Sequence, residues 1–160
     1  NAELSVILYS FNGSVLVEQT KAIEVSSTCS TKAHKLSSDK LIGKHDQSEI
    51  MLRCELKKDG TSISKNNFFF FKPKDLKLTK PKFDYQHEII DNRYFIIIYS
   101  YNFIHKLYIN CLNCRGIFSN NYFEMLPNEK IKIEFEPIEK LENNCNSLSF
   151  DLKSFYDLIN

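Results

Sequence analysis

Apolar and polar residues alternate with a period of two along most of the chain, which is typical of β-strands that bury one face. In the first half, the alternation predicts strands over residues 3–9, 15–25, 50–56 and 61–71. Asn12-Gly13 and Asp59-Gly60 join these strands as hairpins, because such residue pairs tolerate the positive φ of tight turns. Among the early stretches, only residues 37–43 give no clear prediction.

The alternation continues in the second half. It predicts strands over residues 83–89, 94–99, 106–111, 131–135 and 148–152. Asp91-Asn92 predicts one turn and Gly116 is expected at the centre of another, while the spacing of Ser154 and Asp157 fits a capping box that opens a short final helical turn. Nowhere do apolar residues recur at three-four spacing over the ten or more positions of an ordinary helix. The pattern therefore predicts an all-β protein.

Residues 72–82 interrupt the alternation. Pro73, Pro81 and several lysines suit a stiff, solvated connector, with a short extended piece at 76–78. The lysines indicate a solvated face rather than a phosphate-binding track. The chain is therefore expected to form two small β-sandwich domains in tandem, residues 1–72 and 73–160.

Composition narrows the class of protein. The 160 residues carry 21 Lys and Arg against 20 Asp and Glu, a net charge of +1, which argues against nucleic-acid or anionic-membrane binding. The apolar runs at residues 68–71 and 94–99 are far shorter than the roughly 20 residues that span a bilayer. The chain is also too short for a (β/α)₈ barrel, which takes about 250 residues.

Glu129 is the first catalytic candidate, because an Asn-Glu pair carries the acid/base in many retaining glycosidases built on (β/α)₈ barrels. Here the pair follows Pro127 and precedes a predicted strand, which favours a turn. Retaining hydrolysis also needs a second carboxylate about 5 Å away, and no pattern supplies one. No catalytic residue is therefore predicted.

The five cysteines are the next candidates: Cys29, Cys54, Cys111, Cys114 and Cys145. Cys111 and Cys114 run from the end of a strand into a loop, without the helix N-terminus that lowers a redox thiol's pKa. A structural zinc needs four ligands, and neither the other cysteines nor the four histidines are spaced as partners. The pair is left as a local disulfide or two plain thiols. No metal, cofactor or Cys–His nucleophile is predicted.

Asn12-Gly13-Ser14 is an acceptor triplet for N-glycosylation if the chain enters the secretory route. The chain begins at Asn1 without a charged-then-apolar leader, so a mature chain or a fragment is expected, with any targeting signal out of sight.

Three stretches resemble a known family. The aromatic run 68–71 followed by Lys72-Pro73-Lys74-Asp75-Leu76 is similar to the junction of the two C-terminal immunoglobulin-like domains of β-mannosidases of glycoside hydrolase family 2. Residues 116–127 are similar to the Gly-x-Phe-Ser-Asp-Asn-x-Phe run of the final domain, and residues 148–157 look like the end of the animal lysosomal enzymes. Asn120 replaces the usual Asp, and Ile117 replaces a frequent Arg.

The resemblance implies two immunoglobulin-like domains from the C-terminal region of an exo-acting, retaining β-mannosidase, lysosomal or secreted. Both catalytic glutamates would lie on the missing barrel, and these domains would pack against it and the other accessory domains. The aromatic residues of 116–127 are expected mainly to close the end of the sandwich core, with a surface that touches the catalytic domain as the alternative. Asn120 and Asn121 are expected to bind neighbouring backbone or to adopt positive φ. Oligomeric state is left open.

Two other classes compete with this interpretation. One is a stand-alone immunoglobulin-like binding or adhesion module, and the other is a carbohydrate-binding module whose exposed Tyr and Phe stack on sugars. An upstream reading frame that encodes a barrel favours the mannosidase interpretation. Under that interpretation, the isolated chain is expected to show no saturable glycan binding. Saturable glycan binding favours the carbohydrate-binding module.

Overall fold

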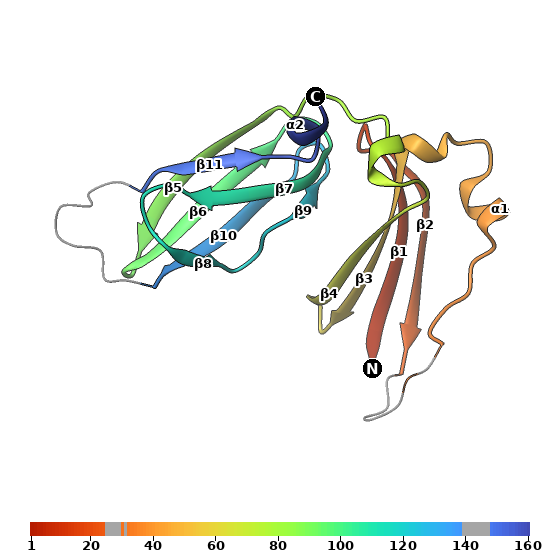
Figure 1. Ribbon diagram of the computed structural model, residues 1–160. Helices are drawn as coiled ribbons and strands as arrows, with labels where there is room; N and C mark the ends of the chain where they lie inside the picture. The colour runs from red at the N-terminus through yellow and green to blue at the C-terminus, as the bar shows by residue number, and fades with distance from the viewer. Residues whose placement is uncertain (25–29, 31, 139–147) are drawn as a thin grey trace. The chain divides into compact units, whose positions relative to one another are not determined.

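The computed structural model describes residues 1–24, 30, 32–138 and 148–160. Cys29 and Cys145 lie outside the described residues. The chain divides into two compact units, Asn1–Lys77 and Leu78–Asn160, coloured red to yellow-green and green to blue in Figure 1. The division lies inside the predicted connector but beyond the expected boundary after residue 72, because the backbone of Lys77 donates a hydrogen bond to Ser48 O of the first unit. Residues 76–78 were expected to be extended; the backbone of Leu76 is extended, and the three residues join no strand.

The first unit is built on one antiparallel sheet of order β2-β1-β3-β4. Its elements are β1 (Ala2–Ser10), β2 (Val15–Ile23), α1 (Ser38–Ile42), η1 (Gln47–Glu49), β3 (Ile50–Lys58), β4 (Thr61–Phe69) and η2 (Pro73–Asp75). Gly13, Asp59 and Gly60 have positive φ, as the predicted hairpin turns require. The four strands predicted in this half are confirmed.

The stretch without a clear prediction, residues 37–43, contains α1. Its apolar residues Leu41 and Ile42 are buried against Leu8 of β1 and Ile50 of β3, which form the core of the first unit. A helix of five residues is too short to show three-four periodicity, so the sequence carried no signal for it.

The second unit is a sandwich of two antiparallel sheets, ordered β5-β6-β10-β8 and β11-β7-β9 (Figure 1). Its elements are β5 (Phe83–Ile90), β6 (Arg93–Ser100), β7 (Ile104–Cys111), β8 (Gly116–Phe118), β9 (Phe123–Met125), β10 (Lys130–Pro137), β11 (Phe150–Lys153) and α2 (Tyr156–Ile159). Ile133 and Phe135 are 1% exposed in the core and Lys132 faces out, while Ile131 and Glu134 are half-buried. The alternation predicted for β10 is therefore confirmed at its three clearest positions.

Gly116 does not lie at the centre of a turn, contrary to the expectation. It is the first residue of β8 and pairs with Pro137 of β10. A Cβ at this position would lie 2.4 Å from Cε2 and Cζ of the Phe135 ring and 2.6 Å from the backbone oxygen of Glu136. Glycine is required here because β8 and the Phe135 ring approach so closely.

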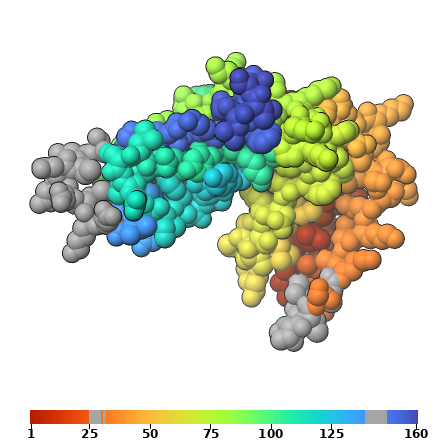
Figure 2. Space-filling model, in the orientation of Figure 1, coloured from red at the N-terminus to blue at the C-terminus, as the bar shows by residue number. Residues whose placement is uncertain are grey.

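The turn predicted at Asp91-Asn92 is confirmed, since both residues have positive φ between β5 and β6. The capping box predicted at Ser154 and Asp157 forms only in part. Asp157 Oδ2 accepts hydrogen bonds from Ser154 N (2.8 Å) and Ser154 Oγ (2.9 Å), but Asp157 N donates to the backbone oxygen of Ser154, and the short final helical turn has Phe155 as its N-cap. That turn, α2, has no buried residue and lies on the surface, in dark blue in Figure 2. Within the described residues, no helix is long and apolar enough to cross a membrane.

Candidate functional sites

Glu129 lies in the turn that precedes β10. Its carboxylate Oε2 accepts a hydrogen bond from Leu126 N at 2.8 Å, and its own backbone N donates to Leu126 O. Asn128, beside it, has positive φ, as an Asn in a tight turn often does. The side chain that resembles a glycosidase acid/base therefore closes the turn at Leu126.

Cys54, Cys111 and Cys114 form no disulfide with one another. Cys111 ends β7, and its Sγ lies 3.5 Å from Asn113 Oδ1. Of the two alternatives left open for Cys111 and Cys114, the structure therefore lacks the local disulfide. Burial raises the pKa of the Cys54 thiol, which lowers its reactivity. Across the described ranges, no three His, Cys, Asp or Glu side chains come close enough together to hold a metal ion.

The stretch 116–127 builds part of the second unit's core. Phe118 packs on Phe135 with ring centroids 4.8 Å apart, and Phe123 is 8% exposed. Tyr122 differs from the expected core role, because it is 59% exposed and stacks on Tyr108. Aromatic stacking on the surface therefore places Tyr122 outside the core.

Asn121 binds neighbouring backbone, as expected. Its side-chain amide donates to Ile109 O at 2.9 Å and accepts from Ile109 N at 2.8 Å. The amide thus makes the two hydrogen bonds that a residue of a paired strand would make. It continues the hydrogen bonding along the β9 edge of β7 at a residue that belongs to no strand.

A buried acid–base pair in the second unit was not predicted. His105 is 3% exposed and its Nδ1 lies 3.6 Å from Glu124 Oε1, which also forms a 2.9 Å ion pair with Lys106. Burial lowers the pKa of His105 below its ordinary 6.5, against the opposing effect of Glu124. Lys106 has positive φ at a register shift of β7, and the adjacent residues Ile104 and His105 are both buried, so the alternation fails there. Because of this irregularity in β7, the sequence pattern did not predict the contact between His105 and Glu124.

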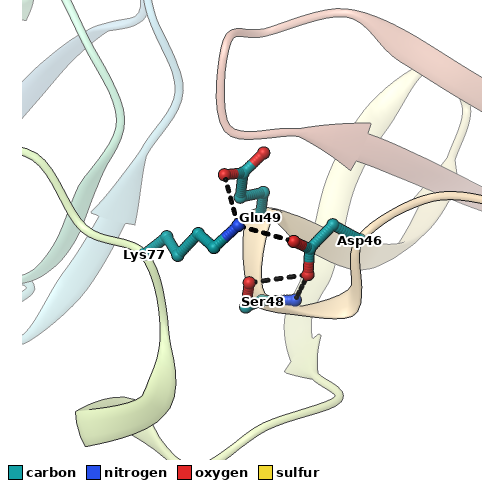
Figure 3. Close-up of polar contacts among 4 residues, drawn as sticks. All are labelled: Asp46, Ser48, Glu49 and Lys77. Atoms are coloured by element: carbon teal, nitrogen blue, oxygen red, sulfur yellow. Dashed lines mark hydrogen bonds and ion pairs between the residues drawn. The ribbon is translucent and has the colours of Figure 1, made fainter.

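A second polar cluster holds the end of the first unit (Figure 3). Lys77 Nζ lies 2.7 Å from Asp46 Oδ2 and 3.3 Å from Glu49 Oε1. The other oxygen of Asp46 accepts hydrogen bonds from Ser48 N and Ser48 Oγ, at 2.9 and 2.7 Å. The hydrogen bonds from Lys77 and then Ser48 hold the pKa of Asp46 well below its ordinary 3.8. We call these four residues the Lys77 clasp, because they hold Lys77, the last residue of the first unit, against η1.

A hollow of about 250 Å³ lies on the outer face of the second unit's larger sheet. It is lined by Asp84, Tyr85, Gln86, Ile97, Tyr99 and Lys130. Asp84 lies opposite Tyr99 between β5 and β6, and Lys130 lies opposite Tyr99 between β6 and β10. The sequence did not predict this site, because its residues come from three separate strands.

Asn12, the candidate glycosylation residue, is exposed in the turn between β1 and β2. Its Oδ1 accepts a hydrogen bond from Ser14 N at 2.9 Å, so the acceptor triplet forms an Asx turn at the surface.

Two family models match the chain in succession. The model described as a mannosidase Ig/CBM-like domain matches residues 1–75, and the model described as an Ig-fold domain matches residues 78–158. The second match spans half of the chain, so the chain belongs to this family of Ig-fold domains. More particularly, the part that matches the mannosidase Ig/CBM-like model is followed directly by the Ig-fold domain, and both parts are all-β. A search of curated proteins finds no match.

Fifteen chains of solved structures resemble this one. Among them is the crystal structure of a β-D-mannosidase from Dictyoglomus thermophilum, with a TM-score of 0.62 and 16% sequence identity. The likeness covers 96% of this chain and 18% of that chain. At this identity the likeness concerns the fold alone, and the present chain spans less than a fifth of the length of the enzyme it matches.

Proposed function

We propose that the chain is a non-catalytic C-terminal accessory region of a β-mannosidase. The observation that carries the proposal is the order of the two matches, a mannosidase Ig/CBM-like domain and then an Ig-fold domain. The β-mannosidase from Dictyoglomus thermophilum has the same fold over 96% of this chain, within a molecule several times longer. A catalytic (β/α)₈ barrel would then lie in another part of the parent protein.

Four acidic residues of the second unit favour a structural role. A retaining glycosidase holds two carboxyl groups about 5–5.5 Å apart around the bond that it cleaves. Glu129 closes a turn, and Glu124 is buried beside Lys106. Glu88 and Glu134 form ion pairs with Lys132 and Arg93. These contacts give each of the four acids a task in holding the fold.

Exposed apolar side chains support packing against other domains. On the second unit, large apolar residues exposed by more than half of their surface are Ile89, Tyr101, Leu112, Ile117, Tyr122, Ile138 and Leu158; on the first they are Val15, Ile63 and Phe68. Apolar surface of this kind is stabilised when a neighbouring domain covers it. The barrel and accessory domains of a parent enzyme would supply that cover.

The parent enzyme in this proposal is an exo-acting, retaining β-mannosidase of glycoside hydrolase family 2 that removes terminal β-linked mannose. We place it in the lysosome or outside the cell, a route on which Asn12 would be glycosylated. Expression through a eukaryotic secretory pathway tests that route: an N-glycosidase should reduce the apparent mass of the wild-type chain and leave that of Asn12→Gln unchanged.

Truncation of the parent enzyme tests the accessory role. Without these two units, the enzyme should lose soluble yield and thermal stability, because apolar surface that they cover becomes exposed. Adding the separately produced chain should restore part of that stability. The chain alone should release no mannose from an aryl β-mannoside, and turnover by the chain alone would contradict the proposal.

A stand-alone immunoglobulin-like binding or adhesion module, or a carbohydrate-binding module, is the second candidate. The observation that favours it is the hollow beside Tyr99, with polar side chains at its rim. An upstream reading frame that lacks a barrel would decide for the second candidate over the first.

A further inference from the structure

The hollow on the outer face of β5, β6 and β10 is walled by an aromatic ring and three different polar groups. The Tyr99 ring lies between Asp84 on one neighbouring strand and Lys130 on the other, and Gln86 follows two residues after Asp84 on the same face. The carboxylate accepts hydrogen bonds, the ammonium donates them, and the amide does both. A ligand in the hollow therefore meets acceptors and donors around one flat apolar surface.

Neighbouring contacts fix the aromatic wall. Tyr99 donates its hydroxyl hydrogen bond to Asn128 Oδ1 at 3.0 Å, and its ring meets that of Tyr101 edge to face with centroids 5.0 Å apart. Tyr101 in turn donates a hydrogen bond to Asp84 Oδ2, which raises the pKa of the Tyr101 phenol. A wall held in place before a ligand arrives loses little conformational entropy on binding.

The other end of the same sheet face shows what a purely structural surface looks like here. There Lys132 pairs with Glu88 at 2.9 Å and lies 4.0 Å from the centre of the Phe95 ring, and Arg93 pairs with Glu134. In the part of the chain that the structure describes, Lys130 has no ion-pair partner. Its ammonium is therefore available to a ligand, unlike that of Lys132.

We propose that this hollow binds one ring of an uncharged sugar. Asp84 disfavours anions and Lys130 disfavours cations, so the pair of opposite charges selects a neutral ligand with several hydroxyl groups. Tyr99 offers its ring to the apolar C–H face of the sugar, while Asp84, Gln86 and Lys130 bind the hydroxyls. A volume of about 250 Å³ is below the roughly 300–1,000 Å³ of drug-sized sites, which fits a single ring.

This inference departs from the sequence-based expectation that the isolated chain binds no glycan. It does not rest on the proposed accessory role, since an accessory domain and a stand-alone module could both carry such a site. The truncation experiment tests only the accessory role, and its result does not change the prediction of sugar binding. The sugar titration tests only the hollow, and its result does not change the accessory role.

Titration of the ¹⁵N-labelled full chain, followed by NMR, tests the proposal. The probes are methyl β-mannoside, methyl β-glucoside, methyl β-galactoside and β-1,4-mannobiose, with adenosine and inorganic phosphate as ligands of other classes. At least one sugar should cause saturable shifts at the amides of Gln86, Tyr99 and Lys130. Tyr99→Ala should weaken that binding about tenfold, equivalent to about 1.4 kcal/mol. Tyr99→Phe, which keeps the ring, should retain most of it.

Tyr122→Ala is the matched control, because Tyr122 is another tyrosine of the second unit whose ring contacts a second tyrosine ring, away from the hollow. It should leave sugar binding unchanged. Gln86→Ala and Lys130→Ala change exposed side chains, so they test the site even if Tyr99→Ala fails to fold, and each should weaken binding. The proposal is overturned if no sugar gives saturable shifts, if adenosine or phosphate binds in preference, or if Tyr122→Ala weakens binding as much as Tyr99→Ala.

Discussion

Replacing Gly116 with alanine tests whether a close approach, rather than a turn, requires glycine at the start of β8. The added methyl group would lie 2.4 Å from the Phe135 ring and 2.6 Å from Glu136 O. Phe135 is 1% exposed and packed between Phe118 and Phe150, so its ring has little room to move. The oxygen belongs to β10, so it shifts only if the β8–β10 pairing opens. Overpacking of this kind costs about 1–3 kcal/mol, and we expect the upper half of that range.

Urea unfolding followed by hydrogen exchange and mass spectrometry measures this effect separately in each unit. Gly116→Ala should lower the unfolding free energy reported by peptides of β8 and β10 by about 2–3 kcal/mol, without changing that of β1 and β3. Gly60→Ala is the matched control. Its Cβ would meet nothing within 4 Å, but its φ is +78, so it should cost about 1–2 kcal/mol in the first unit alone.

Shortening the Phe135 ring provides a second check. In Gly116→Ala/Phe135→Leu the added methyl group no longer meets the end of the ring, so the double variant should lose less stability than the sum of the single variants. The clash with Glu136 O remains, so the rescue should be partial. A Gly116→Ala variant within about 0.5 kcal/mol of the wild type would refute the close approach, because surface substitutions lie in that range.

Three further outcomes follow from the polar groups. Asp46→Asn should increase hydrogen exchange and proteolysis around residues 72–77. Since the pKa of Asp46 is lowered on folding, the clasp should make its full contribution to stability above pH 3.8 and lose it as pH falls from there toward the lower pKa of the folded state. The unfolding free energy should decrease as pH falls below about 6.5, because His105 is protonated in the unfolded chain at a higher pH than in the folded chain. His105→Phe should remove that part of the pH dependence. A variant with the same pH profile as the wild type would contradict the burial of His105. Glu129→Gln in an intact parent enzyme should leave turnover near normal, whereas a loss of several orders of magnitude with folding unchanged would make Glu129 catalytic.

The sequence predicted the strands well where alternation ran for at least four residues. Hairpin turns were found because Asn12-Gly13 and Asp59-Gly60 have the residue types that positive φ demands. The three-residue strands β8 and β9 were missed, because three positions cannot establish a period of two. Gly116 was misplaced for a related reason: glycine marks both turns and close approaches, and only the opposing Phe135 ring distinguishes them.

The sites were less accessible to sequence reasoning, because each depends on register between distant segments. Asp46 and Lys77 are 31 residues apart, and nothing local to either indicates the other. The hollow requires the pairing of Asp84, Tyr99 and Lys130 across three strands. Once that pairing is known, the alternation within each strand does place these side chains on one face.

The outer strands of the first unit's sheet bear on how the protein behaves in concentrated solution. β2 and β4 are the edges of that sheet as described, and most of their middle residues are exposed and polar, including Lys21 in β2 and Lys65 in β4, although β4 also exposes Ile63. An edge strand offers unpaired backbone groups to any other extended chain, and charged side chains oppose that pairing. Both lysines thus act as gatekeepers against intermolecular strand pairing, and exchanging them for β-branched residues would turn these edges into templates for aggregation.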